Sequence, residues 1–115
     1  PLKYDKVRNL PYLKACVRET LRLDPPTGVS SLTQIPNNGR FIPDGTELAS
    51  SPWVIGRNEQ IYGSDFDKFR PERFLEDPKW ADDVLKYDFA WGYGRRKCLG
   101  KPLALFTIYK ILFEV

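Results

Sequence analysis

The chain has 115 residues, of which 42% are hydrophobic and 29% charged, and its formal net charge is +3. This composition argues against a disordered chain, and so small a positive excess, with only Arg95, Arg96 and Lys97 in a run, argues against a nucleic-acid-binding surface. The length allows one domain at most, and no run of about 20 apolar residues is present to span a bilayer.

Two cysteines, Cys16 and Cys98, and the absence of histidine restrict the chemistry. A structural zinc site normally takes four Cys or His ligands, so none is expected within the chain, and catalysis by a Ser–His or Cys–His pair is excluded. A disulfide between the two cysteines is conceivable, but each has a better local explanation. The chain starts at Pro1 and stops at Val115 inside an apolar run, so we expect both ends to be cut and any anchor to lie outside.

An amphipathic helix is predicted over residues 10–23, where apolar residues recur at helical spacing. Asn9 is a suitable N-cap, and Pro11 is tolerated in the first turn because its missing N–H costs nothing there. A Pro-Pro pair then ends the helix. Cys16 lies on the apolar flank, so we expect a buried, inert thiol.

Residues 31–50 change to short strand patterns separated by Asn-Asn-Gly and Pro-Asp-Gly turns, which predict a small antiparallel sheet. Its expected segments are 31–35, 40–42 and 46–49. Pro52 is suited to open a short helix that ends near Arg57.

Residues 61–87 alternate aromatic and charged side chains with poor periodicity, which predicts an irregular, packed, mostly coil segment. A glycine-containing loop over residues 89–98 follows. The last predicted helix, over residues 99–115, is apolar on most sides and is therefore expected to be buried. The fold class predicted for the single domain, residues 1–115, is mainly α with a small antiparallel β-sheet.

Cys98 stands where this loop meets the last helix, in the run Trp91-Gly-Tyr-Gly-Arg-Arg-Lys-Cys-Leu-Gly100. Gly94 allows a tight backbone turn, and Gly100 lets a flat ligand approach the helix. The helix N–H groups, the helix dipole and three neighbouring cations favour the thiolate, which is the form of cysteine that binds a metal. A buried structural cysteine and a redox thiol are the alternatives to a cofactor ligand.

Glu19 and Arg22 are three residues apart on the first helix and lie roughly opposite its apolar stripe. Taken alone, they are interpreted as a solvated surface pair that contributes a few tenths of a kcal/mol.

Three motifs together resemble the cytochrome P450 family. They are the cysteine-loop signature, a Glu-x-x-Arg helix and Pro-Glu-Arg-Phe, and their order and spacing agree with the family over nearly the whole chain. The sequence of these motifs resembles that of filamentous-fungal microsomal members. The signature positions are Trp91, Gly94, Arg96, Cys98 and Gly100.

The resemblance implies that Cys98 is the axial thiolate of haem b, and that Arg96 pairs with a haem propionate. It also implies that Glu19 and Arg22 reach Arg73 in a buried triad. Such a triad contributes more to the choice of one specific conformation than to the net free energy of folding.

Three departures from the family pattern are visible. Trp91 stands where Phe is usual, and Gly56 stands where many members have histidine. Residues 27–34 contain no basic side chain to contact a propionate. Propionate binding is therefore expected to rest on Arg96 and on partners outside this piece.

The implied function is that of an oxidoreductase, a monooxygenase that inserts one atom of dioxygen into a lipophilic small molecule. Electrons would come from NADPH through a reductase. Residues 27–31 are expected to line the substrate side, and Arg95 and Lys97 to meet the reductase, with plain solubility as the alternative. The resemblance also implies fungal secondary metabolism and the cytosolic face of the endoplasmic reticulum membrane.

The piece corresponds to the C-terminal part of the family's fold and is incomplete on its own, because the upstream part of the domain is missing. We therefore expect it to be inactive alone. The competing interpretations are a non-catalytic haem-thiolate binding protein or degenerate remnant, and a small basic interaction module, which the scarcity of clustered Lys and Arg opposes.

Overall fold

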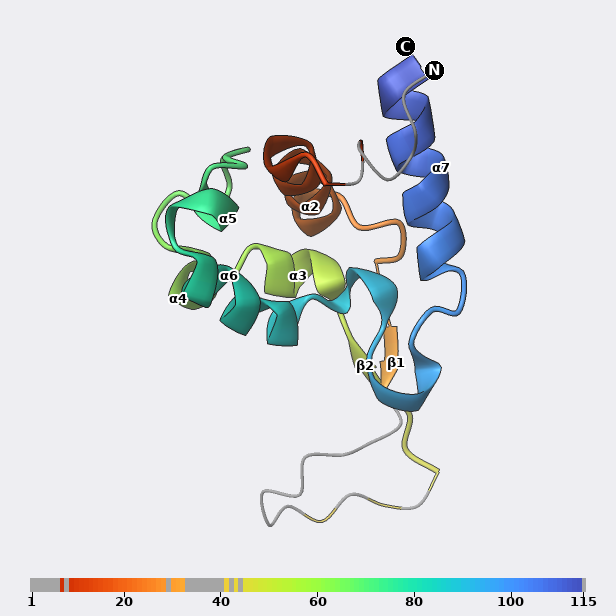
Figure 1. Cartoon of the computed structure of the whole chain (residues 1–115). Coiled ribbons are helices and arrows are strands. Elements are labelled where there is room, and N and C mark those ends of the chain that lie inside the picture. The colour runs from red at the N-terminus through yellow and green to blue at the C-terminus, as the bar shows by residue number, and fades with distance from the viewer. Residues whose placement is uncertain are drawn as a thin grey trace.

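The computed structural model describes Val7, residues 9–28, 30–32, Phe41, Pro43 and residues 45–114, without the side chains of residues 30–32, Leu48 and Arg96. These residues are mostly helical (Figure 1). The elements follow in the order α2 (Pro11–Leu23), β1 (Ser30–Leu32), β2 (Leu48–Ser50), α3 (Pro52–Gly56), α4 (Glu59–Tyr62), α5 (Arg73–Glu76), α6 (Pro78–Asp83), the 3₁₀ turns η1 (Val84–Tyr87), η2 (Phe89–Trp91) and η3 (Gly94–Arg96), and α7 (Lys101–Glu114).

Helix α2 starts one residue later than an Asn9 cap would require. Its N-cap is Leu10, in extended conformation, and no side chain caps the helix there. The prediction of Asn9 is wrong because Pro11 occupies the first turn, and a proline forces the residue before it out of the helical region. At the other end the Asp24 amide donates to the Thr20 carbonyl at 2.8 Å.

Strands β1 and β2 form an antiparallel pair in which Ser31 lies opposite Ala49. The larger sheet predicted over residues 31–50 is not confirmed beyond this pair. Residues 33–40 lie outside the described residues, and Phe41 lies in no strand. Strand β2 leads directly into α3, which Ser51 caps by accepting the Val54 N–H at 3.4 Å.

The segment predicted as mostly coil over residues 61–87 contains α5, α6 and η1, so that prediction is wrong. Helices of one or two turns are too short to show a hydrophobic period. A local signal was present, because Asp77 caps α6 by accepting the N–H groups of Lys79 and Trp80 at 3.0 and 3.1 Å, and Pro78 follows it in the first turn.

Helix α2 lies between α5 and α7 (Figure 1). Its buried apolar side chains belong to two separate clusters. On one side Ala15 packs against the meander, by which we mean residues 61–87. On the other side Val17 packs against Tyr109 of α7. Within the meander, the ring centroid of Trp80 lies 6.1 Å from that of Tyr62 in edge-on geometry. The first cluster consists of Ala15, Tyr62, Phe74, Ala81 and Val84.

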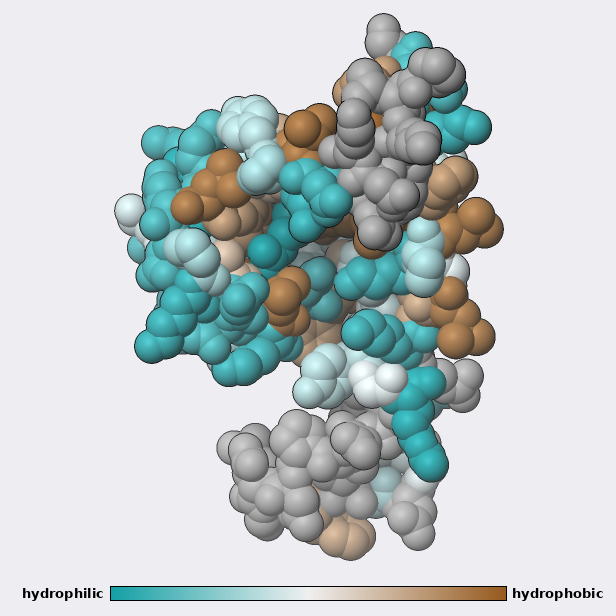
Figure 2. Space-filling view, in the orientation of Figure 1, coloured by the Kyte–Doolittle hydropathy of each residue, from teal (hydrophilic) through white to brown (hydrophobic). Residues whose placement is uncertain are grey.

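Helix α7 is not buried, contrary to the prediction. Tyr109 is its one buried residue among those described, whereas Leu103 within the helix is 70% exposed and Leu99, two residues before it, is 98% exposed. Figure 2 shows hydrophobic groups along the side of the molecule that α7 occupies, while the side of α4 to α6 is mostly hydrophilic. Tyr109, Leu105 and Ile108 of α7 pack with Val17 of α2, whereas Leu103, Ile111 and Leu112 of the same helix are more than half exposed.

Candidate functional site

Glu19 is the centre of a buried charge cluster and is 0% exposed. Its carboxylate accepts two parallel hydrogen bonds from Arg22, from Nε at 2.7 Å and from Nη2 at 2.8 Å. Nε of Arg73 donates to the same carboxylate at 3.1 Å, and the backbone N–H of Arg70 donates at 2.9 Å. One carboxylate thus joins helix α2 to the start of α5.

Both guanidinium groups also bind the backbone of the chain that surrounds them. Arg22 donates to the carbonyl oxygens of Phe66 at 2.6 Å and Lys68 at 3.1 Å, and to that of Gly56. Arg73 donates to the carbonyl oxygen of Tyr62 at 2.9 Å. Several carbonyl groups of the backbone from Gly56 to Lys68 are therefore satisfied by these two arginines, as buried carbonyls require.

The interpretation of Glu19 and Arg22 as a solvated surface pair is overturned by this burial. Burial by itself would raise the pKa of Glu19, but hydrogen bonds from Arg22 and the Arg70 amide, and attraction to Arg22 and Arg73, bring the pKa below its ordinary value. The carboxylate is therefore held in its charged form. The helical face opposite the apolar stripe is buried because the meander, and not water, lies against it.

Further ion pairs, which are partly exposed, lie next to the cluster. Asp65 accepts a hydrogen bond from Nη1 of Arg73 at 3.2 Å and lies 2.7 Å from Nε of Arg70. Although desolvation would raise the pKa of Asp65, the hydrogen bond from Arg73 and the attraction to Arg73 and Arg70 lower it. Arg70 also pairs with Glu76 at 3.0 Å.

The cysteine loop is closed by a backbone hydrogen bond between its two ends. The Cys98 N–H donates to the Trp91 carbonyl oxygen at 2.7 Å. Two glycines make this closure possible, since Gly92 and Gly94 have φ of +72° and +60°, in the left-handed region that side chains disfavour. Trp91, at the start of the loop, is buried.

The Cys98 thiol is free and exposed. A methyl group placed on Gly100 would lie 3.7 Å from Sγ, so the sulfur sits directly beside the start of α7. The exposed apolar surface of Leu99 and Leu103 begins at the same point. An exposed thiol next to an uncovered apolar helix face suits a flat, apolar cofactor held by one axial sulfur ligand, so the residues present fit a haem. The side chain of Arg96 lies outside the described residues.

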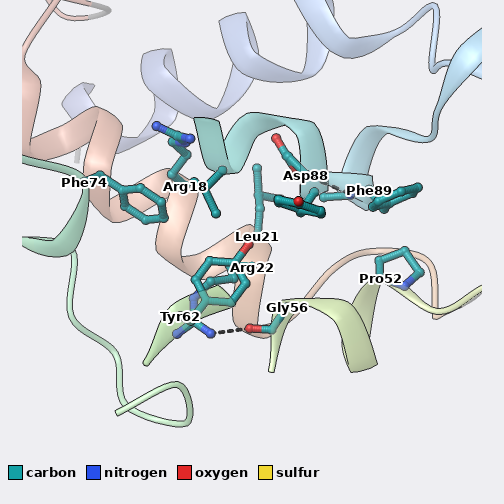
Figure 3. A pocket seen from close by; sticks show the side chains of 12 residues that line it. Arg18, Leu21, Arg22, Pro52, Gly56, Tyr62, Phe74, Asp88 and Phe89 are labelled. Carbon is teal, nitrogen blue, oxygen red and sulfur yellow. Dashed lines mark hydrogen bonds between the residues drawn. The ribbon is translucent and has the colours of Figure 1, made fainter. Parts of the chain in front are cut away.

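A cavity of about 20 Å³ lies next to the buried charge cluster (Figure 3). Its lining includes Arg22 of that cluster, Gly56, and Phe89 and Ala90, which directly precede Trp91 in the chain. The size suffices for about one water molecule. Cys16 belongs neither to the charge cluster nor to the cysteine loop: it is free and half-buried, not fully buried as predicted.

Arg18 is a structural residue that sequence reasoning missed. Its Nη2 donates to the Ala81 carbonyl oxygen at 2.7 Å, and its Cζ lies 4.3 Å from the centroid of the Phe74 ring. Burial lowers the pKa of Arg18, while attraction to Asp88 opposes that shift. No pattern marks such a residue, because a charged side chain on a helix ordinarily indicates the solvent face.

Asp88 and Lys101 were also missed. Asp88 caps η2, where its carboxylate accepts the Ala90 N–H at 3.3 Å. Lys101 places Nζ 5.5 Å from the centroid of the Trp91 ring. Both residues flank the cysteine loop, one at each end.

Among the residues that the structure describes, no helix has the length and hydropathy needed to cross a bilayer.

Comparison with known proteins gives consistent matches over the whole chain. The family pattern described as cytochrome P450 matches residues 1–115. The cytochrome P450 monooxygenase cicH of Emericella nidulans is 39% identical over 96% of this chain, and mpaDE of Penicillium roqueforti is 40% identical over 95%. A pisatin demethylase of Fusarium vanettenii is 33% identical over 100% of the chain. The chain spans 23%, 14% and 23% of the length of these three relatives, respectively.

Proposed function

Because this chain belongs to the cytochrome P450 family, we propose that it is the haem-binding portion of a monooxygenase that inserts one atom of dioxygen into a lipophilic small molecule. The observation that carries the proposal is the closed loop from Trp91 to Cys98, which presents an exposed thiol beside the uncovered apolar face of α7. The relatives bearing the name monooxygenase support the reaction class.

In this proposal Cys98 is the axial ligand of the haem iron, and the bound haem would supply the activation of dioxygen, to which the thiolate contributes electron density. Gly92 and Gly94 bend the loop so that the sulfur is exposed. Trp91 is buried at the start of the loop, Gly100 leaves room for the porphyrin, and Arg96 pairs with a propionate. The cluster of Glu19, Arg22 and Arg73 holds the meander that leads into the loop.

The partners belong to the same proposal. Electrons come from NADPH through a reductase, and the exposed side chains of Arg95 and Lys97 give it a positively charged docking surface. Residues 27–31 line the substrate side, and the β1–β2 pair is part of a larger antiparallel sheet in the complete domain. The proposal also places the protein at the cytosolic face of the endoplasmic reticulum membrane and in fungal secondary metabolism, as the family resemblance implies.

The test is a reduced carbon-monoxide difference spectrum of the longest natural chain that carries this sequence, recorded beside its Cys98→Ser variant. A strongly red-shifted Soret band that disappears in the variant is expected. A band at the ordinary haem-protein position in both proteins would overturn the proposal and favour a remnant or a haem-binding role without monooxygenase chemistry. A Cys16→Ser variant is the matched control, since that thiol lies on α2, away from the loop, and its loss should leave the band unchanged.

A further inference from the structure

The contact between Trp91 and Lys101 gives the unusual tryptophan of the cysteine loop a specific role. Trp91 is 9% exposed, and Nζ of Lys101 lies 5.5 Å from its ring centroid. Tryptophan offers a cation a stronger attraction than phenylalanine, because its ring carries more negative charge on its face. The replacement of the family's usual Phe therefore strengthens the hold on this ammonium group.

Lys101 stands at a position where a positive charge is otherwise unfavourable. It is the first residue of α7, and the helix dipole repels cations from a helix N-terminus. A lysine there would ordinarily extend into water, yet this side chain is half-buried over the indole ring. The contact with Trp91 offsets the repulsion and fixes the ammonium group at the loop.

The backbone of Trp91 is also hydrogen-bonded to that of Cys98. The Trp91 carbonyl oxygen accepts the Cys98 N–H at 2.7 Å, and Lys101 follows Cys98 by three residues at the start of the helix. The backbone of Trp91 thus positions the sulfur while its ring positions the cation. Arg95 and Lys97 are exposed, so water and salt screen their charges more strongly than that of Lys101.

We propose that Lys101, held by Trp91, is a positioning residue that keeps one positive charge at the buried ring of the cysteine loop, three residues after Cys98, and thereby favours the reduced form of the bound haem. This inference rests on the proposed function, in which Cys98 ligates the iron. The bound haem would take up one electron from the reductase, and the part of Lys101 is to hold its positive charge at the loop that carries the thiolate ligand. A fixed cation stabilises the state that carries the additional electron, more strongly in a partly buried site than in water.

The experiment is a reductive titration of the holoenzyme formed by the longest natural chain, with dithionite and redox mediators. Lys101→Met is expected to lower the equilibrium constant for one-electron reduction roughly threefold, which is about 30 mV since tenfold corresponds to 59 mV. Lys101→Arg keeps the charge and should keep the wild-type potential. Lys110→Met removes an exposed lysine from the same helix and serves as the control for net charge.

A double-variant cycle tests the part of Trp91. In a Trp91→Phe background, Lys101→Met is expected to shift the potential by less than in the wild type, because the ammonium group is held less firmly. If Lys101→Met shifts the reduction potential of the Trp91→Phe protein as much as that of the wild type, the role of the indole ring is overturned. A Lys101→Met potential equal to that of Lys110→Met, with the red-shifted carbon-monoxide band intact, would overturn the inference alone. Absence of that band from the wild type would overturn the proposed function and the inference with it.

Discussion

Glu19 and Arg73 are 54 positions apart in the sequence, yet their side chains meet in a buried ion pair of 3.1 Å between Oε1 and Nε. Arg22 completes the cluster from the same helix as Glu19. Among the described residues, the hydrogen bonds that the two guanidinium groups make beyond this carboxylate go to the segment from Gly56 to Lys68. The cluster therefore acts as an internal scaffold for backbone that has little regular structure of its own.

Replacing Glu19 by Gln is expected to destabilise the fold by about 3–5 kcal/mol, because two buried guanidinium groups lose their counter-charge. Urea unfolding of the longest natural chain measures the change, with haem content as a second readout. Glu114→Gln, at the exposed end of α7, is the control and should change stability little. A Glu19→Gln variant as stable as that control would show that the cluster is dispensable.

The stability that Glu19 contributes should depend on pH. Its pKa is lower in the folded chain than its ordinary value of 4.5, so this stability is fully present above about pH 4.5 and is lost as the pH falls through the folded pKa. Urea midpoints measured against pH should fall more steeply on the acid side for the wild type than for Glu19→Gln. Parallel curves would contradict the assignment.

Gly56→Ala is expected to destabilise the fold by about 1–3 kcal/mol, as overpacking in a core does. A methyl group there would collide with the backbone carbonyl oxygen of Arg22, which belongs to a helix and cannot turn aside. Gly28→Ala is the matched control, since a methyl group at Gly28 meets nothing within 4 Å. Equal thermal midpoints for the two variants would disprove the close approach of α2 and α3.

Gly94→Ala and Gly100→Ala should distinguish two requirements for haem binding. The first variant tests the backbone conformation of the loop, and the second tests the space that the haem needs beside α7. Gly94 has φ of +60°, so alanine strains the loop by about 1 kcal/mol and should reduce the red-shifted carbon-monoxide band. At Gly100 the added methyl group makes an ordinary 3.7 Å contact with Sγ, so thermal stability without haem should be unchanged. Loss of haem affinity in Gly100→Ala would then report on the cofactor itself, and unchanged affinity would show that the porphyrin lies elsewhere.

Arg18→Met should weaken the attachment of α6 to α2 by about 1–2 kcal/mol. The variant keeps an apolar side chain of similar length but removes the 2.7 Å hydrogen bond to the Ala81 carbonyl oxygen and the cation over the Phe74 ring. Hydrogen exchange of the amides in residues 78–88 is expected to accelerate. Lys14→Met, exposed on the same helix, should leave these amides unchanged.

Local sequence patterns by themselves identified helix α2, the turn-rich stretch after it and the loop that ends at Cys98. Each of these depends on short-range chemistry: helical spacing of apolar residues, proline at a first turn, and glycines where φ is positive. The position of Cys98 before a helix was predictable for the same reason. The motif order was sufficient to indicate the family, which the match over residues 1–115 confirms.

Tertiary structure decided whether Glu19 faces water or the interior. On the helix alone it lies opposite the apolar stripe, and only the meander packed against that face, with Arg73 at the start of α5, makes the site buried and charged. The exposure of α7 was unpredictable in the same way, since an apolar pattern indicates that a helix requires a covering surface but not which chain supplies it. The contact of Lys101 with Trp91 likewise depends on how the loop folds back over the helix start, which no spacing in the sequence expresses.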